Sequence, residues 1–106
     1  MRRRDVARVR NTSGGLNFAQ DAEQIVIDFD DHPELQGDLA DLGVHVSSND
    51  VAVSDGLLQR LPDAQGVRLA FSFDPAGRTS AELRAQLTRD GRPVSEVWLY
   101  RWRAPA

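Results

Sequence analysis

Short segments in which hydrophobic and polar residues alternate dominate the chain. Every second residue is apolar in residues 25–29 and again in residues 67–73. A period of two residues is typical of β-strands, whose successive side chains point to opposite faces of a sheet. Further segments of this kind begin at Val44, Val51 and Leu57, and turn-forming residues separate them. The pattern predicts an all-β fold of about six to seven antiparallel strands, arranged as an immunoglobulin-like β-sandwich without the cysteine pair of antibody domains.

Residues 81–87 carry two conflicting signals. Their composition is that of a helix, because Ala, Glu, Leu, Arg and Gln are good helix formers, and Ser80 is a residue type that caps helices. The apolar positions nevertheless alternate with polar ones, and the segment runs directly into Arg89, Asp90 and Gly91. These residues suit a hairpin loop made of a type I turn and a glycine in the left-handed region. We therefore predict a strand, a three-residue loop and a last strand that reaches residue 102.

The length of this loop sets the pairing of the last two strands. A three-residue loop places Leu83 opposite Val97 and Arg84 opposite Glu96, an ion pair worth a few tenths of a kcal/mol to about 1 kcal/mol. A two-residue Asp-Gly turn would place Leu83 opposite Trp98 and mix charge with aromatic residues, so we favour the longer loop. On this register Leu99→Ala should cost about 2–5 kcal/mol, because Leu99 belongs to the core. The predicted core face consists of Leu83, Ala85, Leu87, Val97 and Leu99, packed with Phe71 and Ile27.

The same register sends Trp98, Tyr100 and Trp102 to the opposite side of the hairpin. Three interpretations of this aromatic row are open. The rings form a platform on which sugar rings stack, they contact a second domain, or they pack inside the sandwich or under a neighbouring strand. If they project outward, at least one of the tryptophans should be partly exposed in the isolated chain.

Composition argues against several classes of partner. The chain has 106 residues, the length of one domain, and its formal net charge of −3 provides no basic field for nucleic acid. No apolar segment approaches the length that crosses a membrane. The chain has no cysteine for a disulfide or a zinc site, and no signal peptide follows Met1. We expect neither a nucleic acid partner nor a membrane span.

Residues with catalytic or metal-binding chemistry are few. Asp28, Asp30 and Asp31 form an acidic cluster, but their spacing matches no calcium loop, and solvation of the outer face explains the first two. His32 and His45 have no serine or cysteine in a nucleophile context nearby. We therefore expect no catalytic residue, no metal and no cofactor in this chain.

The last third of the chain carries a family resemblance. The residues are Ala81-Glu82-Leu83-Arg84, then Asp90-Gly91, then residues 95–102, which read SEVWLYRW. These segments resemble the C-terminal end of the periplasmic glucan biosynthesis proteins, the MdoG/OpgG and OpgD family. Residues 25–29 and 67–71 resemble the preceding strands of the same family. The resemblance covers roughly residues 22–102 in order, and the closing hairpin is its most specific part.

The resemblance implies both an organisation and a cellular location. Residues 1–21 would form an interdomain linker, and residues 22–106 would form the immunoglobulin-like domain. The parent protein would be periplasmic and would act on osmoregulated, β-1,2-linked glucans through a large N-terminal domain. That domain would be the main partner of this chain, which would be an excised C-terminal piece.

Two classes of function follow from these expectations. In the first, the chain is a non-catalytic β-sandwich module of a protein for the biosynthesis or processing of periplasmic glucans. In the second, it is a free-standing module that binds carbohydrate, such as glucan, or protein. A self-sufficient enzyme is the weakest of the interpretations, because no acid/base pair or nucleophile is recognisable.

Overall fold

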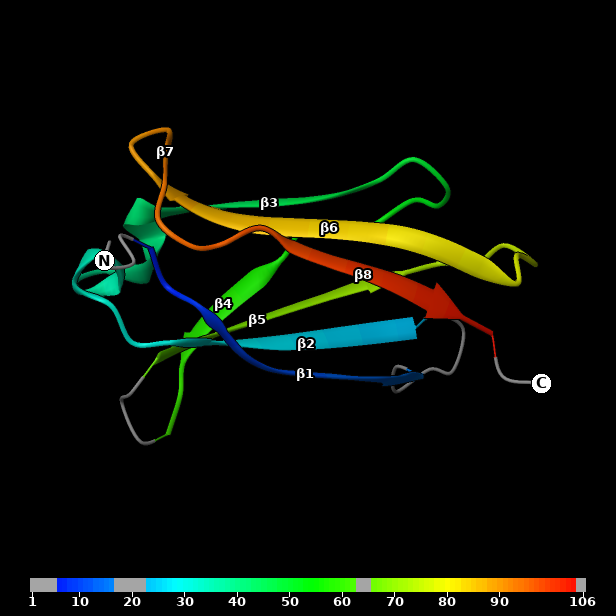
Figure 1. The fold of residues 1–106 in the computed structure, drawn as a ribbon, viewed down its shortest axis with the longest axis horizontal. Coiled ribbons are helices and arrows are strands. Elements are labelled where there is room, and N and C mark those ends of the chain that lie inside the picture. The colour runs from blue at the N-terminus through cyan, green and yellow to red at the C-terminus, as the bar shows by residue number, and fades with distance from the viewer. Residues whose placement is uncertain (1–5, 17–22, 63–65, 105–106) are drawn as a thin grey trace, which may run out of the picture.

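Two antiparallel sheets, packed face to face, make up the protein (Figure 1). The computed structural model describes residues 6–16, 23–62 and 66–104. The first sheet contains, in spatial order, β1 (Val9–Leu16), β2 (Glu23–Asp30), β5 (Gly66–Phe73) and β4 (Leu57–Arg60). The second contains β3 (Leu42–Ser48), β6 (Ser80–Arg89) and, on the other side of β6, both β7 (Arg92–Pro93) and β8 (Trp98–Arg103). This is the strand order of the constant-type immunoglobulin sandwich, with β7 and β8 together as its last strand, so the predicted fold class is confirmed.

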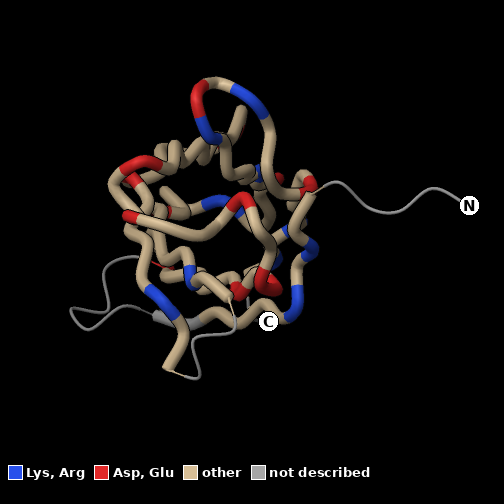
Figure 2. The backbone as a smooth tube through the Cα atoms, turned by 90° about the vertical axis from the view of Figure 1, so that its left-hand side faces the viewer, with Lys and Arg blue, Asp and Glu red and all other residues tan. Residues whose placement is uncertain are grey.

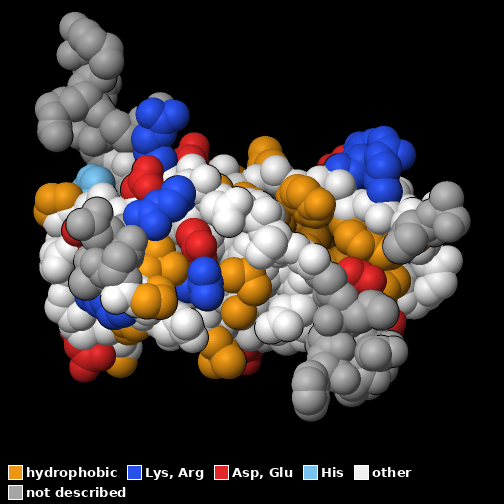
Figure 3. Space-filling view, turned by 90° about the horizontal axis from the view of Figure 1, so that it is seen from below, with side chains coloured by type: hydrophobic (Ala, Val, Ile, Leu, Met, Phe, Trp, Pro, Cys, Tyr) orange, Lys and Arg blue, Asp and Glu red, His pale blue; other side chains and the backbone are white. Residues whose placement is uncertain are grey.

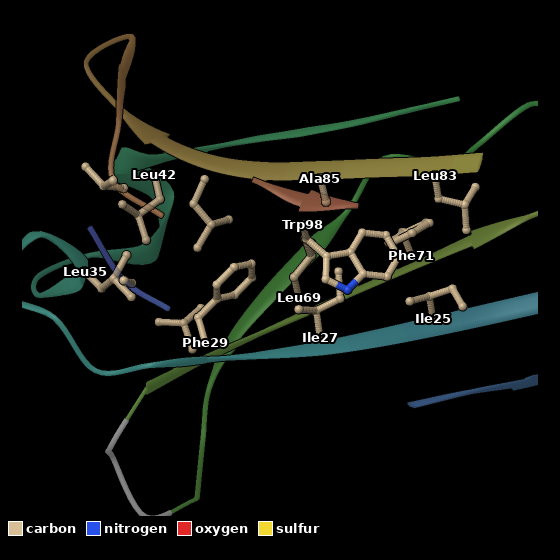
Figure 4. Close-up of a cluster of buried hydrophobic side chains, with 14 of the residues drawn as sticks. Ile25, Ile27, Phe29, Leu35, Leu42, Leu69, Phe71, Leu83, Ala85 and Trp98 are labelled. Atoms are coloured by element: carbon tan, nitrogen blue, oxygen red, sulfur yellow. The ribbon is translucent and has the colours of Figure 1, made fainter. Parts of the chain in front are cut away.

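The core lies between the inward faces of the two sheets (Figure 4). In β2 and β5 the alternation read from the sequence is observed, and the register pairs Ile27 with Leu69 across the first sheet. The second sheet contributes a matching row from β6, so residues 81–87 form a strand in spite of their helical composition. The largest buried side chains of these three strands are Ile25, Ile27, Phe29, Val67, Leu69, Phe71, Phe73, Leu83 and Leu87.

Two single turns of 3₁₀-helix cover one end of the core. η1 (Pro33–Leu35) and η2 (Leu39–Asp41) lie between β2 and β3, and Leu35 is fully buried. Each turn begins with a side chain that accepts a backbone N–H from two residues later, His32 at 3.1 Å and Asp38 at 3.0 Å. In a view along the long axis, acidic and basic residues both lie around the outside of the sandwich (Figure 2).

The segment before β2 belongs to the sandwich. β1 pairs with β2 over its length, and before β1 the small side chain of Ala7 is buried. The Ala7 N–H donates to the Val94 carbonyl at 2.9 Å, and the Ala7 carbonyl accepts the Glu96 N–H at 2.8 Å. The first strand therefore touches both sheets and closes one side of the core. Residues 7–16 of the predicted linker 1–21 are thus paired with the sandwich, and its residues 1–5 and 17–21 lie outside the described part.

The hairpin between β6 and the last strand turns on two residues. Arg89 pairs with Arg92, so the loop consists of Asp90 and Gly91 alone. Both residues have positive φ, 53° and 77°, as a type I′ turn requires. This turn matches the right-handed twist of paired strands, and Asp-Gly is one of its preferred sequences. The predicted three-residue loop was therefore wrong.

A bulge between β7 and β8 adds two residues to the last strand. Thr88 pairs with Pro93 and Ala85 with Trp98, so three steps along β6 correspond to five steps along its partner. Ser95 stabilises the bulge, because its buried hydroxyl accepts a backbone N–H of β6 at 2.9 Å. Side chains alternate between the two faces of a strand, so two extra residues do not change the face on which each β8 side chain lies. The two-residue turn alone therefore sets the orientation of β8.

The turn and the bulge together invert β8 relative to the prediction. Leu83 pairs with Tyr100 instead of Val97, a shift of three positions, and an odd shift exchanges the two faces of a strand. Trp98 consequently points into the core, whereas Leu99 is 72% exposed. The predicted core residues on β6 are buried as expected, but Val97 and Leu99 are exposed, and their assignment to the core was wrong.

Candidate functional site

The aromatic row of β8 lies mostly inside the sandwich. Trp98 and Trp102 are 5% and 7% exposed. Their rings meet Phe71 and Phe73 edge to face, with centroids 5.9 and 5.3 Å apart, and Figure 4 shows the Trp98 indole among core side chains. Tyr100 is 41% exposed, and its ring stacks on Trp98 at 5.3 Å. The two tryptophans therefore pack within the domain, and the expectation that one of them is partly exposed was wrong.

Polar groups of the last strand attach it to the first strand. The Trp98 Nε1 donates to the Thr12 hydroxyl at 3.0 Å, which satisfies the indole N–H inside the core. The Glu96 carboxylate accepts the backbone N–H of Val9. Glu96 therefore serves the junction with β1, and the predicted cross-strand pair Arg84–Glu96 does not form, because the register places Arg84 elsewhere.

The acidic residues near β2 are each held by a neighbouring side chain. Asp28 accepts two hydrogen bonds from Arg68, at 2.8 and 3.1 Å, and its side chain is 10% exposed. Asp30 accepts a hydrogen bond from Arg10 at 2.9 Å, and Asp31 accepts one from a glutamine amide at 2.7 Å. Within the described residues, no three His, Cys, Asp or Glu side chains are grouped so that they would hold a metal ion.

A polar groove lies on the outer face of the second sheet. It has a volume of about 670 Å³ and is lined by the end of β3 and the loop after it, by β6 and by β8. In Figure 1 the loop after β3 lies at the upper right, on the side of β6 away from β8. A second hollow of about 430 Å³, which contains His45, shares Arg84 with the groove. Because Arg84 pairs with Leu99 across the strands, both residues lie in the floor of the groove. The side chains that line it include Asn49, Asp50, Glu82, Arg84, Leu99 and Arg101.

Two of the guanidinium groups on the outer faces are tied to carboxylates. A hydrogen bond to Glu82 and the charge of that carboxylate raise the pKa of Arg101, and Asp50 adds to the effect. A hydrogen bond to Asp28 and its charge likewise raise the pKa of Arg68. Since an arginine is already protonated at neutral pH, the raised pKa leaves the charge of both guanidinium groups unchanged there.

Sequence reasoning found only part of this groove. It singled out Arg84 for an ion pair and Tyr100 for a contact surface, and it assigned Leu99 to the core. The signal that would have found the groove is the Asp90-Gly91 dipeptide. A two-residue turn directs Leu99 and Arg101 to the same outer face as Arg84, next to the end of β3.

By its fold, the chain is an immunoglobulin-like β-sandwich domain with a polar groove on one outer face. The family model described as "Periplasmic glucan biosynthesis protein, MdoG" matches residues 1–102, and the chain belongs to this family. The family resemblance read from the closing hairpin is thereby confirmed.

The curated relatives align with this chain over stretches of different length. Glucans biosynthesis protein G of Vibrio cholerae serotype O1 is 52% identical over 58 residues, which are 54% of this chain and 10% of that protein. Glucans biosynthesis protein G 2 of Shewanella oneidensis is 31% identical over 97 residues, 91% of this chain and 18% of that protein. Glucans biosynthesis protein G of Bradyrhizobium diazoefficiens is 42% identical over 57 residues, covering 54% and 11%. The chain thus spans between a tenth and a fifth of the length of these relatives.

No described helix is long and apolar enough to cross a membrane.

Proposed function

We propose that this chain is a non-catalytic β-sandwich module of a periplasmic protein for the biosynthesis or processing of glucans. The observation that carries the proposal is the difference in coverage, because the alignment takes up 91% of this chain but 18% of the Shewanella relative. More than four fifths of such a protein therefore lies outside the sandwich. We assign the substrate cleft and the reacting residues to that part.

The chemistry of the described residues supports a module without catalysis. The carboxylates of the acidic cluster are held by Arg68, Arg10 and a glutamine, which leaves no opposed acid and base there. His32 accepts a backbone N–H at the start of η1, a structural role. The hydroxyl of Ser95, a buried residue of the bulge, serves the backbone, because it accepts the Leu87 N–H and donates to the Glu96 carbonyl.

The proposal also assigns a location and a partner. The periplasm is the location given in the description of the family. The partner is the remaining part of the parent protein, a large N-terminal domain that acts on β-1,2-linked glucan. We place the start of the module at or before Ala7, because the backbone of that residue is hydrogen bonded to the last strand.

Turnover of β-1,2-glucan by the purified chain is the direct test. We expect no new reducing ends and no change in glucan length after incubation with the chain. The full-length Shewanella relative, treated in the same way, shows what the complete protein does. Turnover by the chain alone, abolished by a single substitution of an Asp or Glu residue, would contradict the proposal.

The alternative, a free-standing binding module, makes a different prediction for assembly. A module of a larger protein should bind the separately produced remainder of its parent, and the mixture should elute as one species in size-exclusion chromatography. A free-standing module should elute unchanged, because it has no such partner.

A further inference from the structure

The loop that forms one wall of the outer groove is fixed to the sheet. The Ser48 hydroxyl donates to the Glu82 carbonyl at 2.7 Å and accepts the backbone N–H groups of Asp50 and Val51 at 3.1 and 3.3 Å. The Asp50 carboxylate accepts the Glu82 N–H at 2.8 Å. These bonds hold the loop against β6 before any ligand arrives. A preorganised wall lowers the entropy that a ligand loses by ordering its site.

The charges in the groove are balanced, and one donor group is unoccupied. The lining contains two arginines and two carboxylates, so it carries no net charge. Arg101 and Glu82 bind each other, and their side chains are 55% and 65% exposed. The guanidinium of Arg84 is exposed and has no hydrogen bond or ion pair with any residue that the structure describes. The groove thus offers both donors and acceptors and carries no net charge.

An apolar surface lies next to these polar groups. Leu99 is 72% exposed, and it is the cross-strand neighbour of Arg84. In a ligand groove, an exposed apolar side chain beside a few polar groups offers a ligand both kinds of contact. Sugar rings combine an apolar C–H face with a rim of hydroxyl groups. A glucose unit would therefore place its C–H face on Leu99 and its hydroxyls on Arg84 and the carboxylates.

We propose that this groove binds an uncharged glucose oligosaccharide, a segment of the glucan that the parent protein handles. The inference rests on the proposed function for its choice of sugar, and on the groove for the place of binding. The volume of about 670 Å³ lies in the usual range for ligand sites, about 300–1,000 Å³. The groove is open to solvent along the sheet, which suits an extended chain that continues beyond the site. The carbohydrate contact thus lies on the outer side of β8, opposite its buried tryptophans.

Isothermal titration calorimetry of the purified chain with linear β-1,2-linked glucose oligomers tests the proposal. We expect measurable binding, and we expect Arg84→Ala and Leu99→Ser each to weaken it about tenfold, as the loss of one good contact to a charged or apolar group does. Both residues are exposed, so the variants should retain the fold, which circular dichroism verifies. The matched controls are Arg78→Ala and Leu57→Ser, exposed residues outside the groove, and these should leave the affinity unchanged.

Several results would overturn the proposal. One is the absence of glucose oligomer binding at millimolar concentration, and another is binding that survives both groove substitutions. Inorganic phosphate that binds as tightly as the oligomer would identify an anion site instead. Binding of the remainder of the parent, lost in Leu99→Ser while glucan does not bind, would identify a domain interface. Reducing ends are measured in the same samples. Absence of glucan binding without new reducing ends would contradict only the groove, whereas new reducing ends would contradict the non-catalytic function.

Discussion

Successive side chains of β8 point to opposite faces of the sheet, and the two faces have different roles. On the inward face, Trp98 is 5% exposed and packs against the rings of the first sheet. The next residue, Leu99, is 72% exposed and lies in the floor of the outer groove. Both side chains are large and apolar, so hydrophobicity does not explain the difference. The difference comes from the number of residues in the preceding turn. Whether this number is even or odd decides which of two neighbouring residues on β8 points into the core.

The outer faces of the two sheets show a similar contrast. On the first sheet, Arg68 is held by two hydrogen bonds to the nearly buried carboxylate of Asp28. Figure 3 views this outer face and shows charged side chains of both signs among hydrophobic ones. On the second sheet, the described residues provide no partner for Arg84, which lines the groove. The same residue type thus completes the structure on one sheet and remains available to a ligand on the other.

Removing the inward indole should have the largest effect. Trp98→Ala leaves a cavity beside Phe71 and removes the hydrogen bond to Thr12, so we expect a loss of about 3–5 kcal/mol in the free energy of unfolding. Urea melts followed by circular dichroism measure it. In the unaltered chain, acrylamide should quench the tryptophan fluorescence weakly. Strong quenching together with a small loss of stability would show that the face assignment is reversed.

The bulge should be the next most sensitive feature. Ser95→Ala removes the acceptor of a buried backbone N–H of β6, and we expect a cost of about 1–3 kcal/mol. Ser54→Ala is the matched control. Its hydroxyl also accepts a backbone N–H at 2.9 Å, but the residue is exposed, and water replaces the lost partner. Equal effects of the two substitutions would show that Ser95 does not stabilise the bulge.

The turn itself can be tested at Asp90. Its φ of 53° lies in the left-handed region, which a β-branched residue adopts only at a cost, so Asp90→Val should lose about 1–2 kcal/mol. Asp90→Asn should be neutral, because asparagine tolerates this conformation. In the three-residue loop, the same position would be right-handed and both substitutions would be nearly neutral. A neutral Asp90→Val therefore argues for the longer loop.

Much of the fold could be predicted from the sequence because the strands of the first sheet alternate cleanly. In β2 and β5, every second residue is a large apolar one, and a single register buries all of them. The last hairpin has no such constraint. Whichever face of β8 points to the core, apolar side chains are buried. These are the tryptophans in one orientation and Val97 with Leu99 in the other. Local turn chemistry then decides, and Asp-Gly favours the two-residue turn.

The groove could not be predicted because its residues become neighbours only through the tertiary fold. Asp50 follows β3, Glu82 lies on β6 and Arg101 lies on β8, and none of them stands in a recognisable motif. Ser48 links the first two, because its hydroxyl donates to the Glu82 carbonyl and accepts the Asp50 N–H. Sequence reasoning placed the aromatic row on the outside because the register of a three-residue loop sends it there. Here the two indole rings fill the core, and the outward leucine forms the apolar part of the surface.

The smallest effect on stability should come from the outward face of β8. Leu99→Ala removes a side chain that is 72% exposed, so we expect a change within about 0.5 kcal/mol in urea melts. Leu83→Ala, on the adjacent strand and fully buried, is the matched control and should cost about 2–5 kcal/mol. The two substitutions delete the same atoms from neighbouring strands, so their difference reports burial alone. If Leu99→Ala costs as much as Leu83→Ala, then Leu99 lies in the core, β8 faces the other way, and the groove loses its apolar floor.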